Sequence, residues 1–404
     1  MTPQRSHSSA PNAAVCPHFG QSTERLSHSY RTYGTYRTYG TYGTYGTYGT
    51  YGTYGTYTSY SSYRSYKSYI LAPMWMIYGA NGYTGELIAR EAVRRGHRPI
   101  LAGRSEKVRA LAQELSLPSR VFDLAKPELE GIRAVLHCAG PFSHTAAPMV
   151  RACLESRVHY LDITGEIAVF ESIFRKDADA KARGIVLLPG VGFDVVPTDC
   201  LAAALHARLP DANELWLAFS SPGSLSRGTL KTMLEGAGLG SAIRKDGRIT
   251  RVPQAWDARE IPFPSKPRFA MTIPWGDIAT AYRTTGIPNI RVYSASSPKS
   301  VRNLRRVRSL LPVLRLKPVQ RLASAYANRR TGPSEEERAR AKTELWGRVA
   351  NAKGEEVTMT NIVDEGYTFT VKSSIAAMER VLASTLTGAL TPALAFGANF
   401  VNQV

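Results

Sequence analysis

The sequence has few cysteines and no long apolar run. Its four cysteines, Cys16, Cys138, Cys153 and Cys200, form no CxxC pair and no metal-ligand spacing. We therefore expect reduced thiols, an intracellular protein and no metal site. No stretch reaches ~18 consecutive apolar residues, so no transmembrane helix is predicted. The N-terminus also lacks the apolar core of about 7–15 residues that a secretory signal contains, which favours a cytoplasmic protein.

Acidic residues are also scarce. The 404 residues include 51 lysines and arginines against 32 aspartates and glutamates, which gives a net charge of +19. Residues 1–73 hold six basic residues and one acid, so most of the excess, +14, belongs to residues 74–404. This balance favours an acidic partner: nucleic acid, anionic lipid or a phosphorylated cofactor. The hydrophobic fraction of 43% is that of a globular protein with room for two to three domains of ~150 residues.

Residues 1–73 differ in kind from the rest of the chain. Fourteen of the 21 tyrosines fall in this segment, and the tripeptide Thr-Tyr-Gly repeats from Tyr39 to Tyr57. The tripeptide supplies no aliphatic core that would offset the entropy lost on ordering the chain. We interpret residues 1–73 as a low-complexity extension that is disordered or spurious, with Met74 or Met76 as the true start. A tyrosine-rich assembly tail is the alternative.

The first strand-like run after the repeat leads directly into a glycine-rich turn and a helical run. The strand is Met76–Tyr78, and the turn has the spacing G-x-x-G-x-x-G. In this context the first glycine permits a tight turn, the second lets the backbone approach a pyrophosphate, and the third lets the helix pack closely. The N–H groups at the start of the helix would bind phosphate oxygens. The predicted cofactor contacts here are Gly79, Asn81, Gly82, Tyr83, Thr84 and Gly85.

The end of the next strand predicts which cofactor binds. The strand Pro99–Ala102 is followed by Gly103, Arg104 and Ser105, about twenty positions beyond the turn, where the adenosine ribose lies. An acid there accepts from the 2′-hydroxyl of NAD, whereas an arginine accommodates the 2′-phosphate of NADP. Arg104 with Ser105 therefore predicts NADP. A solvated arginine at a helix start is the alternative.

Short apolar runs continue to alternate with amphipathic helices as far as residue 194. The pattern predicts six buried parallel strands with right-handed crossovers, which is the α/β fold with a Rossmann-type doubly wound parallel sheet. Ligands of such folds bind beyond the carboxyl ends of the strands. The residues that fall at these ends, and that we therefore expect on one rim, are Arg104, Asp123, Gly140, Asp162 and Asp194.

Beyond residue 210 the rhythm changes to strands interrupted by helices, which predicts a second, α+β domain. Glu344–Ala350 and Glu356–Val363 have the pattern of a hairpin. We divide the chain into an NADP-binding Rossmann domain (74–210), an α+β substrate or dimerisation domain (211–365), and a C-terminal helix and tail that packs back on the first domain (366–404).

The segment Lys299–Arg330 contains ten basic residues and no acid, interleaved with aliphatic side chains. This composition is typical of a pair of core-facing helices with a solvated basic side. Peripheral contact of the segment with an anionic membrane is the alternative. Nucleic acid is not an expected partner, because the segment offers only Tyr326 for base stacking.

Six strings occur in a consistent order over residues 75–397. They are Gly79–Gly85, Ala102–Ser105, Ala139–Phe142, Tyr160–Glu166, Gly192–Asp194 with Pro197 and Asp199, and Leu390–Ala393. Together they resemble the saccharopine dehydrogenase-like oxidoreductases, including the bacterial members grouped with trans-acting enoyl reductases. The resemblance implies a Rossmann domain that binds NADP and an inserted α+β domain. It does not imply saccharopine as the substrate.

We therefore predict an NADP-dependent oxidoreductase that transfers hydride to or from a C=N, C=O or activated C=C bond. The substrate would be a small molecule or lipid-like, and the cofactor would supply the hydride. Gly140 and Pro141 would border the nicotinamide. A non-catalytic NADP-binding sensor or scaffold is the alternative function, and a homo-oligomer is expected.

Four residues near the predicted rim are candidates for proton transfer, namely Asp162, Glu166, Asp194 and His144. Helix capping is the alternative role for Asp162 and Glu166, and His144 is equally consistent with a helix start.

Overall fold

The structure is a computed structural model, and every residue that it describes lies in one compact unit, Lys67–Val404. The residues predicted to form the disordered repeat, and parts of the basic segment Lys299–Arg330, lie outside the described residues. The description covers residues 74–404 apart from 223–225, 227, 231–232, 234–235, 237, 239, 317, 321, 323–324 and 326–331.

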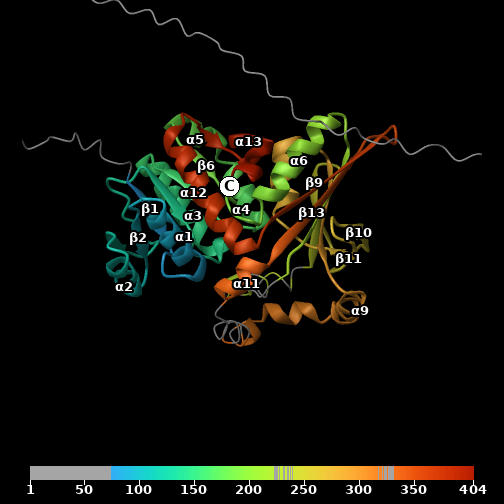
Figure 1. Cartoon of the computed structure of the whole chain (residues 1–404), viewed down its shortest axis with the longest axis horizontal. Helices are drawn as coiled ribbons and strands as arrows, with labels where there is room; N and C mark the ends of the chain where they lie inside the picture. The colour runs from blue at the N-terminus through green and yellow to red at the C-terminus, as the bar shows by residue number, and fades with distance from the viewer. Residues whose placement is uncertain are drawn as a thin grey trace, which may run out of the picture. The chain divides into compact units, whose positions relative to one another are not determined.

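A parallel sheet forms the first half of the described chain (Figure 1). Within the described residues it has seven strands in the order β15-β6-β5-β4-β1-β2-β3, so the chain winds outward in both directions from β1. This arrangement confirms the predicted Rossmann-type sheet. The strands are β1 (Trp75–Tyr78), β2 (Ile100–Gly103), β3 (Ser119–Val121), β4 (Ala134–His137), β5 (His159–Asp162), β6 (Val186–Leu188) and β15 (Gly388–Ala389).

Helices cover both faces of this sheet, which explains why its central strands read as continuous apolar runs. Alternate side chains enter opposite cores: Trp75 and Ile77 pack on one face, Met76 and Tyr78 on the other. The helices on the Ile77 side are α1 (Tyr83–Arg94), α2 (Lys107–Glu114) and α12 (Gly366–Ala383), and α6 (Val196–Arg208) continues this core to the strands of the second sheet. Those on the Tyr78 side are α3 (Phe142–Ser156), α4 (Ile167–Phe174) and α5 (Asp177–Arg183).

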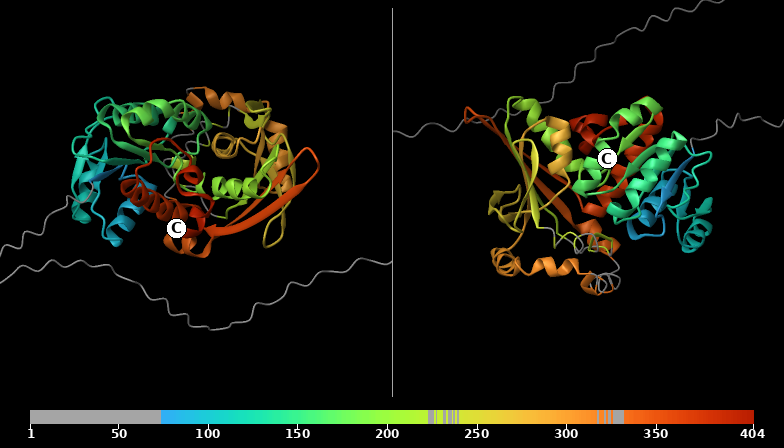
Figure 2. Two further views of the ribbon diagram at one scale, coloured as in Figure 1. Left: turned by 90° about the horizontal axis from the view of Figure 1, so that it is seen from above. Right: turned by 180° about the vertical axis from the view of Figure 1, so that it is seen from behind.

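A second, mixed sheet follows, as predicted. Its main path among the described residues is β10-β11-β12-β7-β13-β14, with β8 and β9 attached to β12. The long hairpin β13–β14 runs beside β7 (Figure 2), and its register confirms the predicted hairpin. The strands are β7 (Glu214–Ser220), β8 (Ser241–Lys245), β9 (Arg248–Val252), β10 (Ala258–Pro262), β11 (Pro267–Thr272), β12 (Asn289–Ala295), β13 (Lys342–Ala350) and β14 (Glu356–Asp364).

Further helices connect these strands. They are α8 (Asp277–Thr285), α9 (Pro298–Val307), the 3₁₀ helix η1 (Leu311–Arg315) and α11 (Glu335–Arg340). No helix in the described part of the chain combines the length and the hydropathy that crossing a membrane requires.

The C-terminal segment returns to the first sheet. Helix α12 packs beside α1, and the Ser373 hydroxyl donates to the carbonyl of Val191 at 2.7 Å. Strand β15 then adds to the sheet edge, parallel to β6. The segment closes with α13 (Pro392–Phe396) and the 3₁₀ helix η2 (Ala398–Gln403), both of which pack on α6. The last residues of the chain thus complete the sheet that the first described residues begin.

Candidate functional site

The glycine turn has the geometry that a dinucleotide requires. Gly79 has φ +86°, in the left-handed region that favours glycine, and its N–H donates to the carbonyl of Ala102 at 2.7 Å. A Cβ atom at Gly79 would lie 2.7 Å from the backbone nitrogen of Ala139. The turn therefore brings the ends of β1, β2 and β4 together, and side chains larger than hydrogen are excluded.

The second and third glycines open the start of α1 to an anion. Gly82 is the N-cap and has no side chain to bond the first N–H groups of the helix. A Cβ atom at Gly85 would lie 2.3 Å from the carbonyl oxygen of Gly79, so this glycine lets α1 sit directly against the turn. Oδ1 of Asn81 lies beside Gly103, within 3.1 Å of where a Cβ would be. This cradle fits the pyrophosphate of a dinucleotide.

The side chain of Tyr83 bonds other protein groups and is not available to bind a phosphate. Its hydroxyl donates to the carbonyl of Pro333 at 2.7 Å and accepts from Nη1 of Arg338 at 2.8 Å. Its ring meets that of Tyr367 edge to face, with 5.0 Å between centroids. Burial raises the pKa of Tyr83. The Tyr83 side chain is therefore engaged by Pro333 and Arg338, which leaves its backbone N–H at the start of α1 for a cofactor.

Arg104 lies exposed at the carboxyl end of β2. Among the described residues it has no hydrogen bond or ion pair, although its charge acts on nearby Tyr78. The Ser105 hydroxyl accepts from the N–H of Lys107 at 3.3 Å, at the start of α2, and keeps its own proton to donate. Asp123, exposed after β3, accepts from the N–H of Ala125 at 2.9 Å. Burial, with the charge of Asp123, raises the pKa of Tyr78 to about 12.

The loop after β4 leaves room for a close ligand. The Gly140–Pro141 peptide is cis, and Pro141 is the N-cap of α3. A Cβ atom at Gly140 would keep an ordinary distance of 3.5 Å from the Phe142 ring. Nothing in the described residues therefore requires glycine at position 140, and the missing side chain leaves this backbone open.

Glu166 binds the N-terminus of a helix that precedes it in the chain. Its Oε1 accepts from the N–H of Phe142 at 2.7 Å, and its Oε2 accepts from the N–H of Ser143 at 2.9 Å. The carboxylate thus satisfies two N–H groups at the positive end of α3. This geometry favours the capping alternative for Glu166, although the helix capped is α3, not the following α4.

We predict that Glu166→Gln lowers the free energy of unfolding by about 1 kcal/mol, because the amide keeps one acceptor but loses the charge that complements the α3 dipole. Urea denaturation of the full chain measures the change. Glu155→Gln is the matched control, since Glu155 is exposed near the other end of α3 and its charge there is unfavourable. Equal stability losses in both variants would contradict a specific capping role.

Asp162 lies at the rim, but its carboxylate is buried and has a structural role. It is 0% exposed, and its carboxylate accepts from the Tyr160 hydroxyl at 2.7 Å and from the N–H groups of Thr164 and Gly190. Burial raises its pKa to about 6, while these hydrogen bonds act in the opposite direction. Asp162 therefore ties the end of β5 to the loop after β6, and its carboxylate is closed to a substrate.

Asp194 has the opposite surroundings. It stands in the loop between β6 and α6, remains partly exposed, and accepts no hydrogen bond from the described residues. Burial raises its pKa to about 7. A Cβ atom at Gly165 would lie 2.5 Å from Oδ2 of Asp194, so the carboxylate lies against the residue that precedes Glu166. Its charge also contributes to the raised pKa of Asp277, at the start of α8 in the second domain.

Aromatic rings continue from Asp194 toward the second domain. Phe193 meets Phe219, near the end of β7, edge to face at 5.9 Å, and Phe219 meets Trp275 at 4.8 Å. The N–H of Phe193 donates to the Thr370 hydroxyl of α12, which fixes the loop. Phe193 and Trp275 are both half-buried. These rings therefore form an apolar path from the loop before α6 to the second domain.

Two histidines lie near this rim. His144 is exposed in the first turn of α3, directly after the N–H groups that Glu166 binds. His137, at the end of β4, was not among the predicted site residues; it is 0% exposed, and neither ring nitrogen has a partner in the described part of the chain. Burial lowers its pKa to about 3, so it is neutral at pH 7. Its neighbours are rings, with Tyr78 stacked at 5.5 Å.

The fold and the rim define a class: a two-domain protein with a dinucleotide-binding Rossmann half. The family model described as the saccharopine dehydrogenase NADP binding domain matches residues 75–188. Residues 75–188 are therefore similar to this NADP-binding domain, which confirms the predicted resemblance and the predicted cofactor.

Relatives and solved structures agree with this assignment. The chain is 33% identical over 180 residues to a Mycobacterium tuberculosis protein provisionally named trans-acting enoyl reductase, covering 40% of this chain and 43% of that protein. It is 27% identical over 202 residues to the human saccharopine dehydrogenase-like oxidoreductase, covering 42% and 47%. The matched segment thus spans less than half of each relative.

The fold also resembles that of apo saccharopine dehydrogenase (L-Glu forming) from Saccharomyces cerevisiae. The TM-score is 0.53 at 10% identity, covering 82% of this chain and 95% of that one. At this identity the likeness shows the fold alone, and it extends across both halves.

Proposed function

We propose that the protein is an NADP-dependent oxidoreductase that transfers hydride between the nicotinamide and a C=N, C=O or activated C=C bond. NADP, when bound, supplies or accepts the hydride. The glycine turn would hold its pyrophosphate, Arg104 and Ser105 its 2′-phosphate, and the backbone at Gly140 and Pro141 its nicotinamide half. The proton that accompanies the hydride requires a separate group of the protein.

One observation carries the proposal beyond cofactor binding: Asp194 is a partly exposed carboxylate at the strand-end rim with a pKa of about 7. A general acid works best when its pKa lies near the working pH. The rim carboxylates Asp162 and Glu166 are already committed to backbone N–H groups. We therefore assign proton exchange with the substrate to Asp194.

The aromatic rings of Phe193, Phe219 and Trp275, which lead from the loop of Asp194 to the second domain, favour an apolar substrate over a charged amino acid. Together with the similarity to a relative named trans-acting enoyl reductase, this favours an acyl chain with an activated C=C bond. The cofactor could transfer hydride equally to a carbonyl or an imine in an apolar molecule, so these substrate classes remain alternatives.

The test follows NADPH consumption by the full chain with three substrate classes. These are trans-2-alkenoyl pantetheine thioesters of increasing chain length, aliphatic aldehydes and cyclic imines. We expect turnover with the thioesters, and a KM that falls as the chain lengthens because each buried CH₂ contributes about 0.8 kcal/mol. Tight NADPH binding without turnover in any class would overturn the proposal and favour the sensor or scaffold alternative.

A further inference from the structure

Helix α9 and the turn that follows it form a strongly basic surface. No acidic residue occurs between Asp277 and Glu335. Within this interval Lys299, Arg302, Arg306 and Arg308 are exposed. None of these four cations forms an ion pair with a described residue, so their charge faces solvent uncompensated. Figures 1 and 2 show α9 at the outer edge of the second domain, beyond β10 and β11.

The same segment exposes aliphatic side chains that a soluble surface would avoid. Val301 is only 2% exposed and anchors α9, but beyond it Val307 is 45% exposed, Leu310 66%, Val313 50% and Leu316 56%. These four residues recur at every third position: Val307 ends α9, Val313 lies within η1, and Leu310 and Leu316 flank η1. The exposed apolar side chains therefore form a stripe confined to this short segment.

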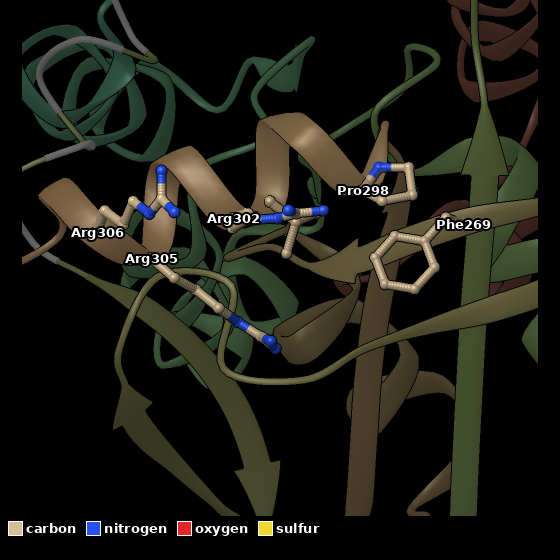
Figure 3. A pocket seen from close by; sticks show the side chains of 6 residues that line it. Phe269, Pro298, Arg302, Arg305 and Arg306 are labelled. Carbon is tan, nitrogen blue, oxygen red and sulfur yellow. The ribbon is translucent and has the colours of Figure 1, made fainter.

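A pocket adjoins this stripe at the start of α9 (Figure 3). It has a volume of about 420 Å³ and is lined by Phe269, Pro298, Val301, Arg302, Arg305 and Arg306. Nε of Arg305 donates to the carbonyl of Ala255 at 2.9 Å, which holds the helix against the loop before β10. Three guanidinium groups around an apolar floor suit a phosphate group that is joined to an apolar body.

We propose that α9 and η1 dock the protein onto an anionic phospholipid bilayer. Arg302, Arg306 and Arg308 would pair with lipid phosphates, and Val307, Leu310, Val313 and Leu316 would enter the boundary between headgroups and acyl chains. A duplex nucleic acid would engage the arginines equally well, but it would leave the aliphatic stripe in water. Because cations and exposed aliphatic side chains occur together on this short segment, we favour a membrane over a nucleic acid as the partner.

The experiment is flotation of the full chain with vesicles of phosphatidylcholine alone and of equimolar phosphatidylcholine and phosphatidylserine. Binding is expected only to the anionic vesicles, and it should weaken as salt is raised. Each cation near an anionic leaflet contributes roughly fivefold in binding, so Arg302→Gln/Arg306→Gln/Arg308→Gln should lose at least about tenfold. Lys126→Gln/Arg151→Gln/Arg183→Gln, three exposed cations of the first domain, changes net charge equally and should bind as the unmodified chain does.

The aliphatic stripe is tested separately by Leu310→Gln/Leu316→Gln. This variant keeps every charge, and it should lose membrane binding while keeping the thermal unfolding profile, because both side chains are already exposed. Retention of a DNA duplex that matches vesicle binding and is insensitive to Leu310→Gln/Leu316→Gln would overturn the proposal. Equal binding losses in the two triple variants would also overturn it, since net charge alone would then explain the attraction.

Discussion

Replacing Arg104 with aspartate is expected to abolish or invert a preference for NADPH over NADH. The unmodified chain should bind NADPH at least about tenfold more tightly, because a charge-assisted contact to the 2′-phosphate contributes roughly 1.5–3 kcal/mol. Arg104 is exposed at the end of β2, and no described residue competes for its guanidinium. Aspartate would repel the 2′-phosphate and could accept from the free 2′-hydroxyl of NADH.

Titration calorimetry of both cofactors with the full chain measures the ratio of the two dissociation constants. Arg109→Asp is the control, because Arg109 is an exposed arginine of α2 that already pairs with Glu106 at 2.6 Å. This control reverses one charge near the site without touching the ribose position, so its cofactor ratio should stay above about tenfold. An unchanged ratio in Arg104→Asp would mean that another residue reads the 2′-phosphate.

The cofactor half of the site was predictable because its rules are local. A strand, a glycine-spaced turn and a helix within the twenty residues Trp75–Arg94 specify a backbone path, and the structure shows why substitution at Gly79 or Gly85 is excluded. The parallel sheet was predictable for the same reason, since buried strands with helices on both sides must be short apolar runs. These features depend on neighbours in sequence.

The roles of the rim carboxylates depend on residues far apart in sequence. Asp162 and Asp194 both follow an apolar strand, yet only Asp162 meets a tyrosine hydroxyl and the N–H of Gly190, 28 positions away. Glu166 likewise caps a helix that begins 24 positions earlier. No local pattern distinguishes a buried carboxylate that links two loops, a helix cap and an accessible acid. Asp162, Glu166 and Asp194 were therefore equal candidates from the sequence.

Two other features of the fold were not predicted from the sequence, for different reasons. Strand β15 is only two residues long, and its pairing with β6 follows from where α12 delivers the chain. The β8–β9 hairpin carried a readable signal, because Asp246 and Gly247 both have positive φ in its turn, as an Asp-Gly hairpin turn requires. Predicting β15 requires knowledge of the tertiary structure, whereas the β8–β9 hairpin could have been predicted from its Asp-Gly turn.

Replacing Asp194 with asparagine is expected to lower kcat by about 10²–10⁴-fold while leaving NADPH affinity unchanged, because the amide keeps the shape but cannot donate the proton. The sign of the pH dependence follows from the pKa of about 7. In the direction of substrate reduction the protonated carboxyl is the active form. The value of kcat/KM should therefore fall as pH rises through about 7, and this inflection should vanish in Asp194→Asn.

A second measurement tests the same ionisation without a substrate. Burial raises the pKa of Asp194 above its ordinary value, so between about pH 4 and 7 the folded protein binds a proton that the unfolded chain does not. The charged carboxylate weakens the fold above pH 7, and this cost is relieved as pH falls. The free energy of unfolding of the unmodified chain should therefore gain, relative to Asp194→Asn, as pH drops from 7 to 4.

Two variants make the outcome specific. Asp211→Asn is the control, because Asp211 is an exposed carboxylate that bonds Asn351 and its pKa is lowered, so the inflection near pH 7 should persist. Gly165→Ala should reduce kcat with Asp194 intact, since its Cβ would displace the carboxylate from its present position. If Asp194→Asn kept more than about a third of the activity and the same pH profile, the proton would have to come from another group, and exposed His144 would be the next residue to replace.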